Sequence, residues 1–94
     1  MARFRVIKCY WFWQRDVVVM TGDIVEGPVL PGMFIDLPRS LRGPGRVPID
    51  TLEEIQFPTH RQLAVLIQHR ELDSAPMFEP SAVEGRVLEV TAHR

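Results

Sequence analysis

The chain has 94 residues, of which 46% are hydrophobic and 24% charged, and its formal net charge is −1. This length suits one domain over residues 1–94, and the composition is that of an ordinary globular protein. A charge so near zero excludes a global electrostatic attraction to nucleic acid or to an anionic membrane, but it leaves room for a local basic patch.

The compartment is predicted from the N-terminal residues and from the hydrophobic runs. Lys8 interrupts the apolar stretch near the N-terminus and no small-residue cleavage site follows, so we expect no signal peptide. No run approaches the roughly 18 apolar residues that a membrane-spanning helix needs. We therefore expect a cytoplasmic protein that makes no membrane contact.

The first half of the chain predicts short strands interrupted by glycine and proline. Residues 4–13 are rich in aromatic and β-branched side chains, and residues 16–26 form a second expected strand. Gly22 lies inside that second strand, where glycine usually marks a bulge, a bend or a close backbone approach. A third strand is expected over 33–37, after a Pro-Gly turn. Residues 39–48 contain two glycines, two prolines and three arginines, which predicts a loop.

The second half is ambiguous at two places. Residues 49–57 and 59–71 alternate like strands, but each also carries a possible helix capping box near its start. Residues 72–80 read as a loop, 83–85 as a turn and 86–91 as a closing strand. Many short strands separated by glycine and proline are typical of a barrel or a sandwich.

Four motifs, in this order, resemble those of a known family. The segment Thr21-Gly22-Asp23-Ile24-Val25-Glu26-Gly27 is followed by four residues, Gly32 and the alternating stretch 33–37. Ala64-Val65-Leu66-Ile67 and Glu84-Gly85-Arg86-Val87-Leu88 follow later. This series resembles the β-barrel second domain of translational GTPases such as elongation factor Tu. The resemblance implies an all-β fold, a small closed antiparallel β-barrel of six or seven strands, and it favours strands in the ambiguous segments.

Small barrels bend their strands sharply at corners, and glycine permits such bends. We expect Gly22, Gly27, Gly32 and Gly85 to be those corners and turns. The chain departs from the family in having no phosphate-binding loop, so GTP hydrolysis is excluded. In the family the barrel leans on the nucleotide domain and helps to hold the aminoacyl end of transfer RNA, but those contact residues cannot be placed on this sequence.

Three arginines in the expected loop form the first candidate binding site. Arg39, Arg42 and Arg46 flank Gly43 and Gly45, whose exposed amides would join the guanidinium groups around a phosphate or carboxylate. RNA or another polyanion is the ligand that this pattern predicts. The alternative interpretation is a solvated, mobile loop.

The aromatic run Tyr10-Trp11-Phe12-Trp13 is the second candidate. Successive side chains of a strand point to opposite faces, so about half of these rings must face away from the barrel interior. Either another segment such as residues 75–78 covers them, or a protein partner or a second copy does, since aromatic residues are enriched at interface cores. Stacking on nucleic-acid bases is a third possibility, although little charge flanks the run.

No catalytic or metal chemistry is predicted. Cys9 is the only cysteine, so no internal disulfide forms, and we expect it to be a buried small hydrophobe. The three histidines lie far apart, so neither a metal nor another cofactor is expected. None of Ser40, Ser74 and Ser81 occupies a nucleophile elbow.

The sequence therefore predicts a non-catalytic binding or interaction module. The main alternative is an RNA-binding accessory that uses the arginine loop. An enzyme of unknown class ranks last among the alternatives, because acid–base catalysis needs a geometry that no residue spacing here indicates.

Overall fold

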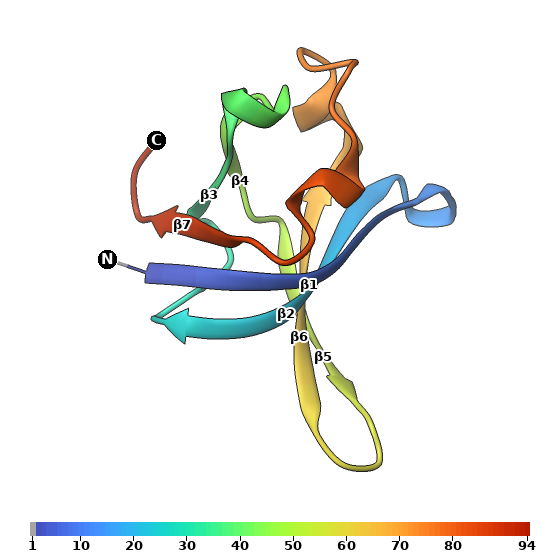
Figure 1. The fold of residues 1–94 in the computed structure, drawn as a ribbon, viewed down its shortest axis with the longest axis vertical. Helices are drawn as coiled ribbons and strands as arrows, with labels where there is room; N and C mark the ends of the chain where they lie inside the picture. The colour runs from blue at the N-terminus through green and yellow to red at the C-terminus, as the bar shows by residue number, and fades with distance from the viewer. Residues whose placement is uncertain (1) are drawn as a thin grey trace.

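A computed structural model describes residues 2–94 as one antiparallel sheet of seven strands that curls into an open half-barrel (Figure 1). The strands are β1 (Ala2–Phe12), β2 (Val17–Glu26), β3 (Phe34–Leu37), β4 (Gly45–Pro48), β5 (Thr51–Gln56), β6 (Arg61–Gln68) and β7 (Val87–Thr91). Four short 3₁₀ turns accompany them: η1 (Trp13–Arg15), η2 (Arg39–Leu41), η3 (His69–Leu72) and η4 (Pro80–Val83). The strand order is β4-β3-β7-β1-β2-β6-β5. The all-β prediction is confirmed.

The two edge strands, β4 and β5, are consecutive in the chain. Only Ile49 and Asp50 separate them. The amide of Ile49 donates to the carbonyl of Met33 at 2.8 Å, and the amide of Asp50 donates to that of Leu66 at 2.9 Å. The chain thus passes from one edge of the sheet to the other within two residues, which requires the sheet to curl. Among the described residues no strand pairing joins β4 to β5, so the closed barrel stays a prediction.

A β-bulge lies where β1 crosses β2. Val6 is opposite Gly22 and Lys8 is opposite Thr21, which leaves Ile7 as an extra residue on β1. A Cβ atom on Gly22 would overlap the carbonyl oxygen of Arg5. The bulge changes whether the even-numbered or the odd-numbered residues of β1 face inward. Bulges also bend the strand that carries them. The buried residues of β1 are therefore even-numbered as far as Val6, whereas Cys9 is the buried residue beyond the bulge.

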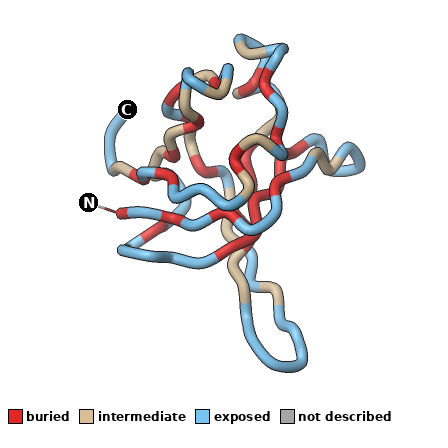
Figure 2. The backbone as a smooth tube through the Cα atoms, in the orientation of Figure 1, coloured by how far each residue is buried: buried red, intermediate tan, exposed pale blue. Residues whose placement is uncertain are grey.

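The core lies inside the curl, as the buried red segments in Figure 2 show. Phe4, Met20, Ile35 and Ile67 are fully buried there. A smaller cluster occupies the opposite face of the β2–β6 pair, with these members: Val17, Val19, Ala64 and Leu66. The end of β1 contributes to both clusters, since Trp11 packs on the main core and Phe12 on the smaller one.

Residues 59–71 and 39–48 can be compared with the elements that their local sequence predicts. Residues 59–71 contain β6 rather than a helix, and β6 pairs with β2 and β5 on its two sides. The loop predicted over 39–48 is wrong at its end, because residues 45–48 form β4 against β3. Pro48 lies on an edge strand, where a missing amide hydrogen is tolerated.

Glycines shape two of the turns. Gly32 has a φ of +87°, and the amide of Met33 donates to the carbonyl of Leu30 at 3.2 Å around the Pro31-Gly32 pair. Gly85 has a φ of +82°, in the region that favours glycine. None of the helical turns in residues 2–94 has the length or hydropathy to cross a bilayer.

We expect Gly22→Ala to lower the free energy of unfolding far more than Gly85→Ala. A methyl group at Gly22 must push β1 away from β2, a packing and hydrogen-bond loss of at least about 3 kcal/mol. At Gly85 a Cβ meets nothing within 4 Å. Only the positive φ then destabilises the Gly85→Ala variant, and it lowers the free energy of unfolding by roughly 1–2 kcal/mol. Urea unfolding of both variants measures the difference, and equal losses would contradict the close approach at Gly22.

Candidate functional site

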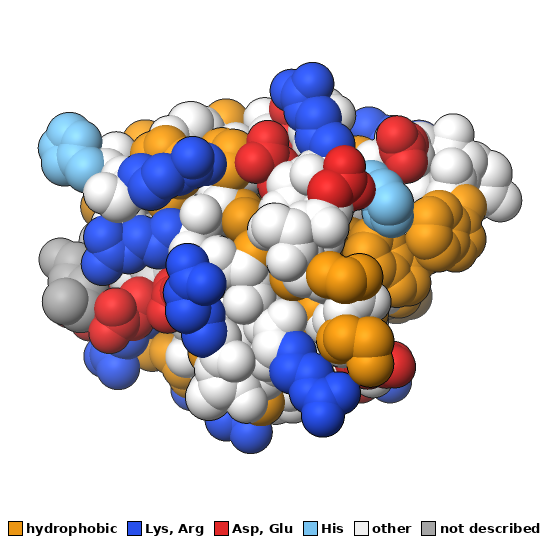
Figure 3. Space-filling model, turned by 90° about the horizontal axis from the view of Figure 1, so that it is seen from above, with side chains coloured by type: hydrophobic (Ala, Val, Ile, Leu, Met, Phe, Trp, Pro, Cys, Tyr) orange, Lys and Arg blue, Asp and Glu red, His pale blue; other side chains and the backbone are white. Residues whose placement is uncertain are grey.

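The turns η2 and η3 project from the same end of the half-barrel, at the top of Figure 1. Figure 3 looks down on this end. Most Lys and Arg side chains of this view lie on its left, whereas the hydrophobic side chains gather on its right, and carboxylates and a histidine lie on each side. Two cavities lie here, one basic and one aromatic.

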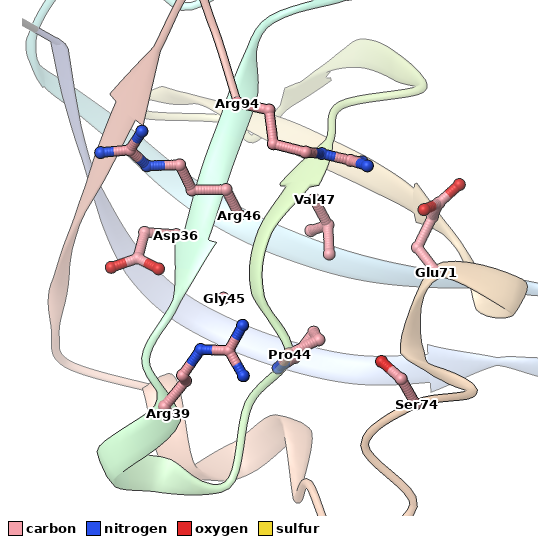
Figure 4. A pocket seen from close by; sticks show the side chains of 9 residues that line it. All are labelled: Asp36, Arg39, Pro44, Gly45, Arg46, Val47, Glu71, Ser74 and Arg94. Carbon is pink, nitrogen blue, oxygen red and sulfur yellow. The ribbon is translucent and has the colours of Figure 1, made fainter.

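The basic cavity, which we call the arginine groove, has a volume of about 540 Å³. Arg39, Arg46 and Arg94 line it (Figure 4). Asp36 lines the same side, and Glu71 and Ser74 form the facing wall. The groove therefore lies between the β3–β4 hairpin and the segment that follows β6.

Different elements position the three arginines. Arg39 begins η2, and its guanidinium lies against Gly45. Arg46 is on β4, opposite Asp36 of β3. Arg94 follows β7, and its guanidinium lies 5.1 Å from the ring centroid of Phe34, within cation–π range.

The structure brings together only part of the predicted arginine site. Arg39 and Arg46 line the groove, whereas Arg42 does not. Arg42 follows η2 as its C-terminal cap, with a φ of 64°. Arg94 takes a place that loop composition did not indicate, because the pairing of β7 with β3 at Phe34 and Thr91 carries the following residues to the groove.

The arginines of the groove have no carboxylate partner, which is also true of Arg5, Arg42 and Arg86 within residues 2–94. Arg3, Arg15, Arg61 and Arg70 each have a carboxylate oxygen within 4 Å. Within residues 2–94 no such ion pair involves the three groove arginines. Their positive charge is thus free to meet an external anion, while Asp36 and Glu71 partly offset it.

The second cavity, which we call the aromatic cavity, has a volume of about 430 Å³. Trp11 and Trp13 stack with ring centroids 5.1 Å apart and planes inclined by 18°. The His69 ring lies 4.8 Å from that of Trp11 and 5.2 Å from that of Trp13. Asp73, Phe78 and Glu79 also line the cavity.

Residues 75–78, the expected cover for the aromatic run, reach these rings only in part. Ala75, Pro76 and Phe78 border the same cavity as Trp11 and Trp13. Trp13 nevertheless keeps 64% of its surface exposed, and Tyr10 keeps 46%. The segment forms one wall of the cavity and leaves much of the aromatic surface accessible.

Cys9 is buried, and its amide donates to Oε2 of Glu84 at 3.0 Å. Burial, and secondarily the negative charge of Glu84, raises the pKa of the Cys9 thiol to about 12. A thiolate is the reactive form of cysteine, so this thiol is inert near neutral pH. Among the described residues no group of three His, Cys, Asp or Glu side chains comes together as a metal site.

Comparison with models of known protein families, with curated proteins and with solved structures finds no match to this chain.

We expect the Cys9 thiol of the folded protein to resist Ellman's reagent at pH 8 and to react fully in denaturant. The raised pKa also predicts a pH effect. Above about pH 8.5 the unfolded thiol ionises while the folded one stays protonated, so stability falls by about 1.4 kcal/mol per pH unit until about pH 12. Unfolding curves of the wild type and of Cys9→Ala, compared over this range, isolate the contribution; parallel pH dependences would contradict it.

Proposed function

We propose that this chain is a non-catalytic binding module that holds a phosphate-bearing polymer, RNA, in the arginine groove. One observation carries the proposal. Three arginines from η2, β4 and the segment after β7 line one cavity, and no ion pair among residues 2–94 involves them. Arginine forks match phosphate oxygens and bind them in a bidentate way.

The local charge supports a selective, weak to moderate interaction. The formal net charge of −1 provides little long-range attraction, so affinity must come from the groove. Asp36 and Glu71 restrict where an anion can lie, and Glu71 has a cation of its own, Arg70, at 3.8 Å. A phosphate would therefore have to lie away from these two carboxylates.

We further propose that the fold is a translation-factor domain 2-like barrel, closed through β4 and β5. Three features support this. The two edge strands follow one another in the chain with only Ile49 and Asp50 between them. Positive φ angles occur at Gly32 and Gly85, two of the glycines in the resembling motifs. Residues 64–67, expected as an inner strand, belong to β6.

A protein partner or a second copy that contacts the aromatic strand is the second candidate function. The observation that favours it is the exposed surface of Trp13 and Tyr10 beside the aromatic cavity. Such a contact would be governed by apolar burial and would depend little on salt, unlike phosphate binding.

We expect the triple variant Arg39→Gln/Arg46→Gln/Arg94→Gln to lose binding to single-stranded oligouridine. Each lost phosphate contact lowers the magnitude of the slope of log K against log salt by about 0.7, so the slope should fall by about 2. Fluorescence anisotropy with a labelled oligouridine at several salt concentrations measures both quantities.

Two matched variants serve as controls. The variant Arg3→Gln/Arg15→Gln/Arg61→Gln removes the same charge from exposed ion pairs outside the groove and should bind almost as the wild type does. The single variant Arg42→Gln should have a smaller effect than Arg39→Gln, since only Arg39 lines the groove. No binding by the wild type, or equal losses in both triple variants, would refute RNA binding at this groove.

A further inference from the structure

The aromatic cavity combines aromatic rings with carboxylates, a pairing that the arginine groove does not have. Its lining includes Trp11, Trp13 and Phe78, and the carboxylates of Asp73 and Glu79. No lysine or arginine lines it in the described part of the chain. The electrostatic field of this cavity therefore favours a cation, because ring faces and carboxylates both attract positive charge.

His69 lies between two carboxylates, one of which lines this cavity, and can offset at most one negative charge. Its Nδ1 lies 3.8 Å from Oδ1 of Asp16 and 3.9 Å from Oδ1 of Asp73. The single imidazole of His69 is thus the neighbour of two carboxylates. Glu79 has no ion-pair partner within residues 2–94. Charge remains for an incoming cation to neutralise.

The shape of the aromatic cluster distinguishes between kinds of cation. A trimethylammonium group is held best by several aromatic faces turned toward one point. Here Trp11 and Trp13 instead form a nearly parallel pair inclined by 18°. A stacked pair suits a flat cation that adds another layer or lies along it, and a guanidinium is flat and pairs with carboxylates through its forked donors.

We propose that the aromatic cavity is a docking site for an arginine side chain of a partner protein. The guanidinium would lie on the tryptophan pair and donate to Asp73 and Glu79. The apolar stem of the arginine would lie along Pro76 and Phe78, as such stems commonly cover apolar surface. This proposal does not depend on RNA binding by the arginine groove, which lies on the other side of residues 69–75.

The test uses the two tryptophans directly, since Trp11 and Trp13 are the only tryptophans in the chain and both line the cavity. The full chain is titrated with acetyl-Gly-Arg-Gly-amide while the two indole N–H resonances are followed by NMR. We expect saturable shifts of both resonances. The same peptide with citrulline, the uncharged isostere of arginine, should bind at least about tenfold more weakly, because the charge is lost.

Variants define the site. Asp73→Asn/Glu79→Gln should weaken peptide binding at least about tenfold, whereas Asp50→Asn/Glu89→Gln removes the same charge from exposed positions outside the cavity and should leave it unchanged. The triple arginine variant of the groove should also bind the peptide normally, which separates this proposal from the proposed function. Trp13→Leu should abolish the response of the remaining indole.

Several results would overturn the proposal. Equal binding of the arginine and citrulline peptides would show that charge is not recognised. Tighter binding of tetramethylammonium than of the arginine peptide would make the site one for quaternary ammonium groups, and tighter binding of free arginine would make it one for the amino acid. An unchanged affinity in Asp73→Asn/Glu79→Gln would remove the carboxylates from the site.

Discussion

The close approach of β1 and β2 at Gly22 is the constraint on which the rest of the structure depends. Because Gly22 has no side chain, the backbone of β1 passes over it at Arg5, and the extra residue Ile7 bends β1 at that point. The bend turns the second half of β1 toward the loop-rich end. Without it, Trp11 would not reach the main core, and Trp13 would not stand beside His69.

The curl that starts there brings distant parts of the chain together. β3, β4 and the segment after β7 meet residues that follow β6, although these segments are far apart in the sequence. The result is a surface with two separate chemistries. Arginines without ion-pair partners among the described residues lie on one side, and tryptophans with carboxylates lie on the other. A protein with a formal net charge of −1 thereby presents two oppositely charged sites.

Local sequence signals were sufficient where side chains alone determine the strand. The valine cluster of β2 and the alternation of β7 predict their strands, and the Pro31-Gly32 pair predicts its turn. β4 was missed because Gly45, Pro48 and the preceding Gly43-Pro44 pair disfavour a strand locally, and only pairing with β3 stabilises it. For residues 59–71 the local signals were balanced, and the pairing of β6 with strands on both sides decides in favour of a strand.

The candidate sites were predictable to a similar extent. Alternation correctly places Trp11 and Phe12 on opposite faces of the sheet. Arg39 and Arg46 both line the groove although Arg46 lies on β4 and not in a loop, and Arg42, which follows η2, does not line it. Arg94 and the carboxylates of the aromatic cavity depend on contacts between distant segments, which no local motif reveals.

The segment from His69 to Ala75 is a common partition between the two cavities: Glu71 and Ser74 face one, and His69, Leu72 and Asp73 face the other. A ligand that displaces this partition changes the shape of both compartments at once. Thermodynamic linkage then makes the effect reciprocal. If a ligand in one cavity changes the affinity of the other cavity by some factor, a ligand in the other cavity changes the affinity of the first by the same factor. In a chain this small, η3 and the three residues that follow it would be enough to couple the two binding events.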